Sequence, residues 1–196
     1  MTLVAIVYHS GFGHTKKQAE AVAQGVREAG AEAALHAAEE FPAPQGNQYA
    51  PPWDTLEKAD AIVFGCPTYM GSVTAGLKVF MERSSGVWFQ QAWKDKLAGG
   101  FSNSGSLAGD KLNTLQDIMC FAGQHSMLWV SLGMMPPGDD AIGVPDEPNR
   151  MGGFLGAYAQ SRHAASPEES PPAGDLQTAR FYGSRIALLA ARMAST

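Results

Sequence analysis

The stretch Leu3–Thr15, with the sequence LVAIVYHSGFGHT, predicts the fold of the whole chain. It begins with an apolar, partly β-branched run from Leu3 to Tyr8, which is typical of a buried strand. A turn of small polar residues and glycines follows, and a helical pattern begins directly after it. Backbone N–H groups at the positive end of a helix can hold a phosphate without an arginine. The residues that offer such groups, with two hydroxyls, are Ser10, Gly11, Gly13 and Thr15.

Two well-known phosphate-binding motifs fit this turn poorly. A dinucleotide fingerprint needs a third glycine where Lys16 stands, and an acidic residue at the end of the second strand, where His36 and Ala37 stand. A nucleotide P-loop would continue with Lys-Ser/Thr, whereas His14 follows Gly13. The turn therefore suits a monophosphate, which in a doubly wound sheet favours FMN where the strand order reverses. A tight turn without any ligand stays open as the alternative for this loop alone.

Two later loops are expected at the same edge of the sheet. The segment from Pro67 to Gly71 follows an apolar strand and forms a turn whose amides and side chains could grip a flat ring. The segment from Ser102 to Gly109 is made mostly of small residues, which let the backbone approach a ligand closely. Each alone could be an ordinary loop. Because right-handed crossovers bring the ends of parallel strands to one edge, the three together indicate a binding site.

The rest of the chain alternates strands and helices, which predicts one α/β domain over residues 1–196. A long connection from Gly133 to Gly174, rich in Gly and Pro, is either functional or disordered. We expect further strands at residues 32–37, 61–65, 97–101 and 127–132, and a short extra strand within 154–159. We also expect a surface loop at 39–52. One helix is expected to end at Gly30, and further helices are expected at 53–58, 77–81, 112–122 and 176–193.

Composition excludes several classes of protein. The net charge is −5 and no basic run could neutralise a nucleic-acid backbone, so we expect no nucleic-acid partner. The first apolar run is too short for a signal peptide and no later run could cross a membrane, so we expect a soluble cytoplasmic protein. Cys66 and Cys120 are interpreted as buried thiols in a reducing compartment. His9, His36 and His163 show no metal-ligand spacing, so no metal is predicted.

These loops, with Ser166–Glu169 and Leu176–Gly183 near the end, resemble those of flavodoxin-like FMN proteins, and among them the WrbA-type NAD(P)H:quinone oxidoreductases. The resemblance covers nearly the whole chain. It implies a doubly wound five-stranded parallel sheet, order 2-1-3-4-5, with helices on both faces. It also implies FMN, with the phosphate on the first loop, the flavin ring on the second, and the ribityl chain and ring edge along the third. The implied cofactor-binding residues are Ser10, Gly11, Phe12, Gly13, His14, Thr15, Pro67, Thr68, Tyr69, Met70, Gly71, Ser102, Asn103, Ser104 and Gly105.

Three residues are candidates for contact with the substrate or for catalysis, and one of them, Tyr69, is also among the implied cofactor-binding residues. The second loop of the WrbA-type proteins usually has the sequence Pro-Thr-Arg-Phe-Gly, whereas Tyr69 and Met70 fill its middle positions here, and Tyr69 is also a candidate for substrate contact. His125 matches a family histidine near the flavin that could bond a quinone oxygen or relay a proton. Trp88 resembles a tryptophan at the family's active-site mouth. Simple packing explains His125 and Trp88 equally well.

The resemblance implies that the chemistry belongs to the cofactor. FMN would accept a hydride from NADPH or NADH and pass two electrons to a quinone-like small molecule. The family also implies a homodimer or homotetramer. Two alternatives stay open: a flavodoxin-type carrier that delivers electrons to protein partners, and a flavin-free regulatory protein with the same fold.

Overall fold

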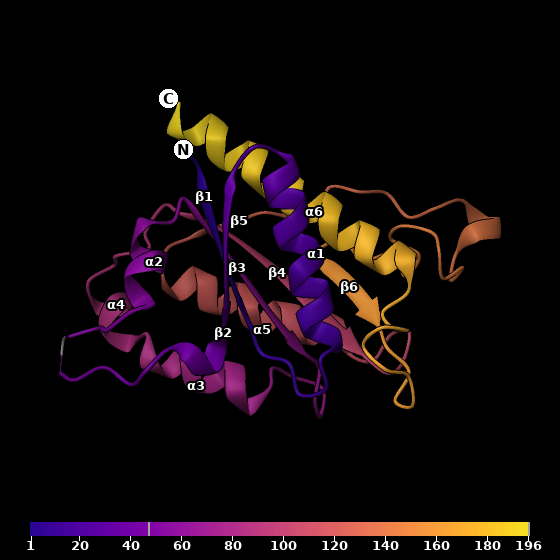
Figure 1. Ribbon diagram of the computed structural model, residues 1–196, viewed down its shortest axis with the longest axis horizontal. Helices are drawn as coiled ribbons and strands as arrows, with labels where there is room; N and C mark the ends of the chain where they lie inside the picture. Colours follow the sequence, from indigo (N-terminus) through magenta and orange to yellow (C-terminus); the bar gives the residue numbers. More distant parts are fainter. Residues whose placement is uncertain (47, 196) are drawn as a thin grey trace.

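The computed structural model describes residues 1–46 and 48–195. The chain forms a parallel sheet between two layers of helices (Figure 1). The strands are β1 (Leu3–Tyr8), β2 (Glu32–Ala37), β3 (Ala61–Pro67), β4 (Leu97–Ser104), β5 (Leu128–Trp129) and β6 (Ala157–Gln160). The helices are α1 (His14–Glu28), α2 (Trp53–Lys58), α3 (Ala75–Arg83), α4 (Ser85–Phe89), α5 (Lys111–Gln124) and α6 (Ala173–Ala194), with the 3-10 turns η1 (Ala38–Glu40) and η2 (Asp139–Ala141).

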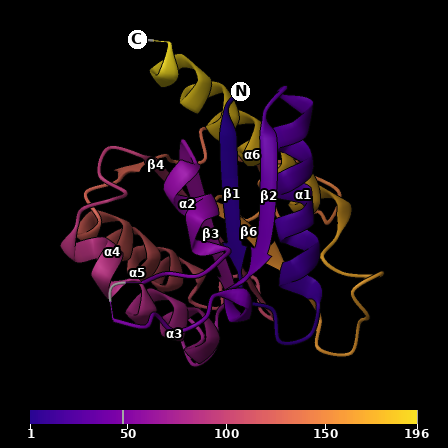
Figure 2. The same cartoon turned by 60° about the vertical axis from the view of Figure 1, so that its left-hand side comes forward.

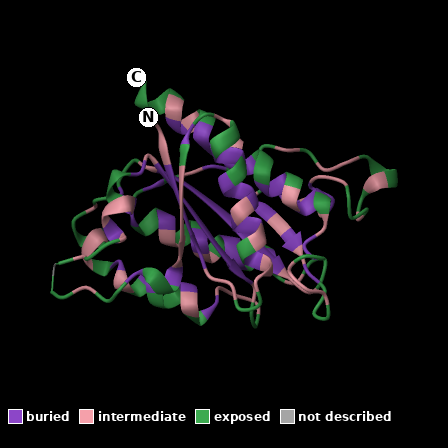
Figure 3. Ribbon diagram, viewed as in Figure 1, coloured by how far each residue is buried: buried purple, intermediate pink, exposed green. Residues whose placement is uncertain are grey.

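The sheet has the strand order that the resemblance implies, β2-β1-β3-β4-β5, with every pair parallel. Side chains of β1 alternate between two cores. Val4 and Ile6 point to the core that α1 and α6 cover, whereas Ala5 and Val7 point to the core that α2, α3 and α5 cover. Figure 2 shows the two helical layers on opposite sides of the sheet, and Figure 3 shows that the central strands between them are buried. The prediction of a doubly wound α/β fold is confirmed.

The fifth strand is shorter than predicted, because two separate segments share its position. The expected strand 127–132 keeps strand pairing only at β5, beside Leu97 and Ala98 at the beginning of β4. The chain then leaves the sheet and returns as β6, which pairs in parallel with the other half of β4. This is the extra strand expected within 154–159, and it begins and ends later than predicted. Residues 130–156 form the insertion between the two halves.

Two smaller predictions were wrong. The helix α4 was not expected, since five residues with none buried carry no helical period of apolar positions. Cys120 is exposed, because it lies on the outer side of α5, whereas Cys66 is buried as expected. Burial raises the pKa of the Cys66 thiol to about 11, so it stays protonated at neutral pH.

Candidate FMN site

One hollow opens at the carboxyl edge of the sheet, and all three predicted loops line it. Strand register explains the convergence, since Tyr8 lies beside Gly65, and Pro67 beside Asn103. The lining residues are Ser10, Gly11, Phe12, His14, Thr15, Pro67, Tyr69, Asn103, Ser104, Gly105, Ser161 and His163. All of them except the last two are among the residues predicted from the sequence to bind the cofactor.

The first loop ends in an open helix terminus. Gly13 precedes α1 with φ +87°, a left-handed conformation that favours glycine. Gly13, the N-cap residue, makes no side-chain cap at this terminus, and the first turn of α1 contains no acidic residue. The Ser10 hydroxyl oxygen accepts a hydrogen bond of 3.2 Å from the Lys16 N–H. The remaining N–H groups of the first turn are therefore free to bind an anion.

The segment 161–170, here called the strap, forms a fourth side of the hollow that the sequence analysis missed. Its first residue, Ser161, donates its N–H to the Ser104 carbonyl (3.0 Å), and its hydroxyl accepts from the Asn103 amide (2.8 Å). Farther along, the His14 imidazole Nε2 lies 2.9 Å from the Ala165 carbonyl oxygen. A Cβ atom on Gly105 would lie 2.7 Å from Nε2 of His163. The strap thus packs directly against the first and third loops.

The second loop is a tight turn whose tip is exposed. Tyr69 and Ser72 exchange two backbone hydrogen bonds of 3.2 Å, and between them Met70 adopts φ +49° with its side chain in solvent. The Tyr69 hydroxyl lies against Gly11, where a Cβ atom would come within 2.5 Å of it. Met70 and Gly71 do not line the hollow, so this loop presents Pro67 and Tyr69 to it.

Hydrogen bonds between hydroxyl groups connect the second loop to the third loop and to α5. Oγ1 of Thr68 lies 2.9 Å from Oγ of Ser102 and 2.8 Å from Oγ1 of Thr114 in α5. Thr68 also donates its N–H to the Asn103 carbonyl (2.8 Å). Thr68 and Ser102 do not line the hollow. Their hydrogen bonds instead fix the positions of the loops that do.

A family model described as NADPH-dependent FMN reductase matches residues 1–136, which include all three predicted loops. This chain belongs to that family. The cofactor is FMN, with NAD(P)H as reductant, as the sequence resemblance implied.

Individual relatives extend the likeness beyond the family model. A protein named Flavodoxin FldP from Pseudomonas aeruginosa is 41% identical over 95% of this chain and 96% of its own. An NAD(P)H dehydrogenase (quinone) from Geobacter sulfurreducens is 34% identical over 97% of this chain and 98% of its own. The crystal structure of a WrbA-like flavodoxin from Agrobacterium tumefaciens superposes with a TM-score of 0.71 at 41% identity, covering 98% of this chain and 99% of that one. The likeness to WrbA-type proteins is confirmed.

The hollow has the chemistry that the family cofactor needs. The uncapped terminus of α1 can bind one phosphate group, and the hydroxyls of Ser10 and Thr15 lie on the same loop. Among the described residues, the lining contains no Lys, Arg, Asp or Glu, so the flavin would meet hydroxyls, amides, two imidazoles and apolar surface. Tyr69 lies at the rim of the hollow and is 41% exposed.

His125 and Trp88 lie together in a second hollow, away from the three loops. His125 follows α5, and Leu128, three residues later, pairs with Leu97 at the opposite end of β4 from Ser104. The His125 side chain is 1% exposed, stacks against Trp93, and has Nε2 3.0 Å from the Ser84 hydroxyl. Within one chain, therefore, the two candidate substrate groups do not reach the loop hollow.

The buried histidine should make folding stability depend on pH. Burial lowers the pKa of His125 to about 4, whereas an unfolded histidine titrates near 6.5. The unfolded chain therefore binds the extra proton first, and the stabilisation present above pH 6.5 is lost as pH falls towards 4. At pH 5 the loss from this group is about 2 kcal/mol. We expect the urea midpoint of His125→Gln to change less between pH 8 and pH 5 than that of the wild type. An equal change in both proteins would contradict the assignment.

Two further expectations from the sequence concern membrane-spanning helices and metal sites. Among residues 1–46 and 48–195, no helix has the length and apolar character to cross a membrane. The same residues contain no cluster of three or more His, Cys, Asp or Glu side chains arranged to hold a metal ion.

Proposed function

We propose that this chain is an FMN-dependent reductase that takes electrons from NADPH or NADH and passes them to a quinone or another flat acceptor. The observation that carries the proposal is the hollow formed by three loops, with an uncapped helix terminus at one end and the exposed Tyr69 ring at its rim. The relative from Geobacter sulfurreducens, named for this reaction, supports the choice of acceptor. The balanced reaction consumes NAD(P)H, one proton and a quinone, and forms NAD(P)⁺ and a quinol.

The protein would bind and orient FMN and the substrates, and FMN, when bound, would supply the hydride and electron chemistry. We assign the phosphate to the first loop and the start of α1. Donors to the polar edge of the ring, where negative charge develops on reduction, are expected from the sequence among the backbone amides of residues 68–71 and 103–105. The N–H groups of Thr68 and Tyr69 already donate to the Asn103 and Ser72 carbonyls, so we propose the amides of residues 70–71 and 103–105. Met70 and Gly71 would contribute only through their backbone N–H groups, since neither residue lines the hollow.

Trp88 and His125 could act on the acceptor only if a second copy of the chain brought their hollow to the first. We propose such a homo-oligomer, a dimer or tetramer. Trp88 is 43% exposed and its neighbour Phe89 81% exposed, so together they offer an apolar contact surface next to the second hollow. His125 stays neutral at pH 7 because burial lowers its pKa to about 4, so it would act through a hydrogen bond rather than as a cation.

An electron carrier is the second candidate function, because the Pseudomonas aeruginosa relative is named a flavodoxin. A carrier would bind the same FMN in the same hollow but would exchange electrons with protein partners. Its flavin would not be reduced quickly by a nicotinamide. The net charge of −5 offers only a modest acidic field to steer such partners. We also propose a cytoplasmic location, where nicotinamides would be available.

The test is an anaerobic visible spectrum of the FMN-loaded protein, taken before and after addition of NADPH or NADH. We expect the flavin absorption to bleach within seconds and to return when benzoquinone is added. Steady-state rates with both substrates varied should give parallel double-reciprocal lines, since one open ring face serves both in turn. Trp88→Ala should raise the KM for the quinone while leaving the nicotinamide half-reaction unchanged. Bound flavin that neither nicotinamide bleaches would favour the carrier.

A further inference from the structure

Lys111, the first residue of α5, is buried beneath the third loop. Its side chain is 0% exposed, which is rare for lysine. The ammonium Nζ donates to the Ser104 hydroxyl (2.7 Å) and to the carbonyls of Ser106 and Leu107 (2.8 Å each). All three ammonium hydrogens therefore have a partner within one loop, and one of those partners, Ser104, lines the hollow.

A second donor holds the same loop from the strap side. The Gln160 side-chain amide donates to the Gly105 carbonyl (3.0 Å), and its oxygen accepts from the Arg150 guanidinium (3.0 Å). Three consecutive carbonyls, those of residues 105 to 107, thus point towards the side-chain donors of Gln160 and Lys111. Because each peptide is planar and trans, the N–H groups of residues 106 to 108 point away from those donors. The shape of the loop depends on these contacts, since it lies outside any helix or strand.

The ammonium is a net positive charge in this region. Burial lowers the pKa of Lys111 to about 8, so the group remains mostly charged at pH 7. The groups that face it are the Tyr158 ring, 5.9 Å from Nζ, and the charges of Asp175 and Arg150. Asp175 and Arg150 form a buried ion pair of 2.8 Å and largely cancel each other. The positive charge of Lys111 is therefore not neutralised by a carboxylate.

We propose that Lys111 is a positioning residue for FMN: it holds the third loop in the shape that faces the cofactor, and its fixed positive charge behind that loop favours the reduced flavin. This inference rests on the proposed placement of FMN in the loop hollow. Reduced flavin carries more negative charge on its ring than oxidised flavin, and a protein charge near the ring tunes that balance.

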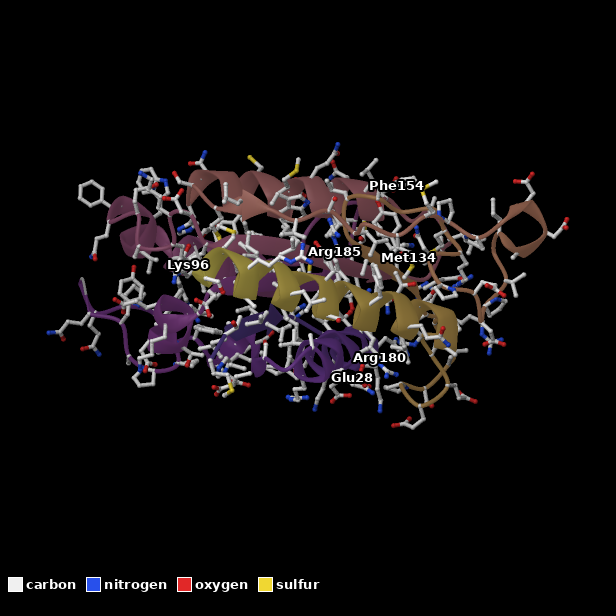
Figure 4. The ribbon with its side chains drawn as sticks, turned by 90° about the horizontal axis from the view of Figure 1, so that it is seen from above. Glu28, Lys96, Met134, Phe154, Arg180 and Arg185 are labelled. Carbon is white, nitrogen blue, oxygen red and sulfur yellow. The ribbon has the colours of Figure 1, made fainter. Side chains whose placement is uncertain are left out.

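The chain offers a matched control, a half-buried lysine whose ammonium also donates to backbone carbonyls. Lys96 precedes β4 at the opposite edge of the sheet, beside the end of α6 in Figure 4, and donates to the carbonyls of Glu57 (2.7 Å) and Ala59 (2.6 Å). Burial lowers the pKa of Lys96 as well. Lys96→Met and Lys111→Met therefore remove the same kind of group, and only the second lies beneath the hollow.

The experiment measures the dissociation constant of oxidised FMN by fluorescence quenching, and the midpoint potential of the bound flavin against a reference dye. We expect Lys111→Met to weaken FMN binding about tenfold and to reduce the preference for reduced over oxidised flavin by a further factor of about ten, a shift of about 30 mV to lower potential for two electrons. Lys96→Met should match the wild type in both. A Lys111→Met protein that behaves like Lys96→Met would overturn the proposal.

A second measurement keeps the test decisive if Lys111→Met does not fold. Deprotonation of the Lys111 ammonium leaves only two hydrogens for three acceptors. The affinity of the wild type for FMN should therefore fall several-fold between pH 7 and pH 9. This window lies above the pH range in which histidines ordinarily titrate. An affinity that is constant over this window would contradict the proposal. The midpoint potential is measured with a chemical reductant, so it can be obtained even if no nicotinamide reduces the protein. Failure of the proposed reductase function is therefore distinguished from failure of the proposed role of Lys111.

Discussion

Gly13→Ala should abolish FMN binding, whereas Gly30→Ala should leave it intact. The Gly13 backbone has φ +87°, and an alanine there is strained in any surroundings. Its Cβ atom would also lie 2.7 Å from Cγ of Pro167, a ring in the strap. Relief of that contact would move either the turn or the strap, and both border the hollow. Because the phosphate depends on the N–H groups at this turn, we expect the dissociation constant of FMN to rise by about a hundredfold or more.

Gly30 is the matched control, because it has nearly the same backbone conformation beyond the other end of the same helix. Its φ is +82°, and no atom would come within 4 Å of an added Cβ. Each alanine variant should lose about 1 kcal/mol from the left-handed backbone, and Gly13→Ala should lose more because of its contact with Pro167. The measurements are FMN fluorescence quenching and urea unfolding of the apoprotein. A Gly13→Ala protein that binds FMN within threefold of the wild type would show that the phosphate lies elsewhere.

The first loop could be predicted from sequence because all its determinants are contiguous. An apolar strand, a Gly-containing turn and an amphipathic helix lie within a few residues of Gly13, and local physics alone places the turn at a helix terminus. The other two loops needed one further rule, that parallel strands with right-handed crossovers end at one edge. Ten of the lining residues lie on the loops that these two steps locate, and the family resemblance assigned them to the cofactor.

The strap and Lys111 could not be predicted in the same way. Ser161 and His163 reach the hollow because β6 returns to the sheet beside β4 after a long insertion. The short strand was expected, but its local pattern does not indicate which strand it pairs with. The useful clue would have been that they come directly after β6, as Gly105 comes directly after β4. A lysine at a helix start is normally exposed, so the burial of Lys111 follows only from the loop folded over it.

The close packing of α1 against α6 in the core could not be predicted from the sequence either. The two helices cross so closely that a Cβ atom on Gly25 would lie 1.8 Å from the Arg180 carbonyl oxygen, and one on Gly183 would lie 2.0 Å from that of Val22. An exposed ion pair between Glu28 and Arg180 spans the same contact in Figure 4, and surface pairs of this kind contribute little. Close backbone packing at the two glycines therefore stabilises this contact more than the ion pair does.

Gly183→Ala should consequently be among the most destabilising single-methyl changes in the chain. The obstacle is a backbone carbonyl rather than the end of a flexible side chain, so α6 must shift away from α1 and open the core between them. We expect a loss of about 3 kcal/mol or more in the free energy of unfolding. Gly123→Ala is the control: Gly123 lies on the exposed side of α5 with nothing within 4 Å of an added Cβ. That variant should gain roughly 0.5–1 kcal/mol from helix propensity. Urea unfolding of the two apoproteins checks the pair, and a similar small change in both would mean that α1 and α6 tolerate a wider separation than this packing implies.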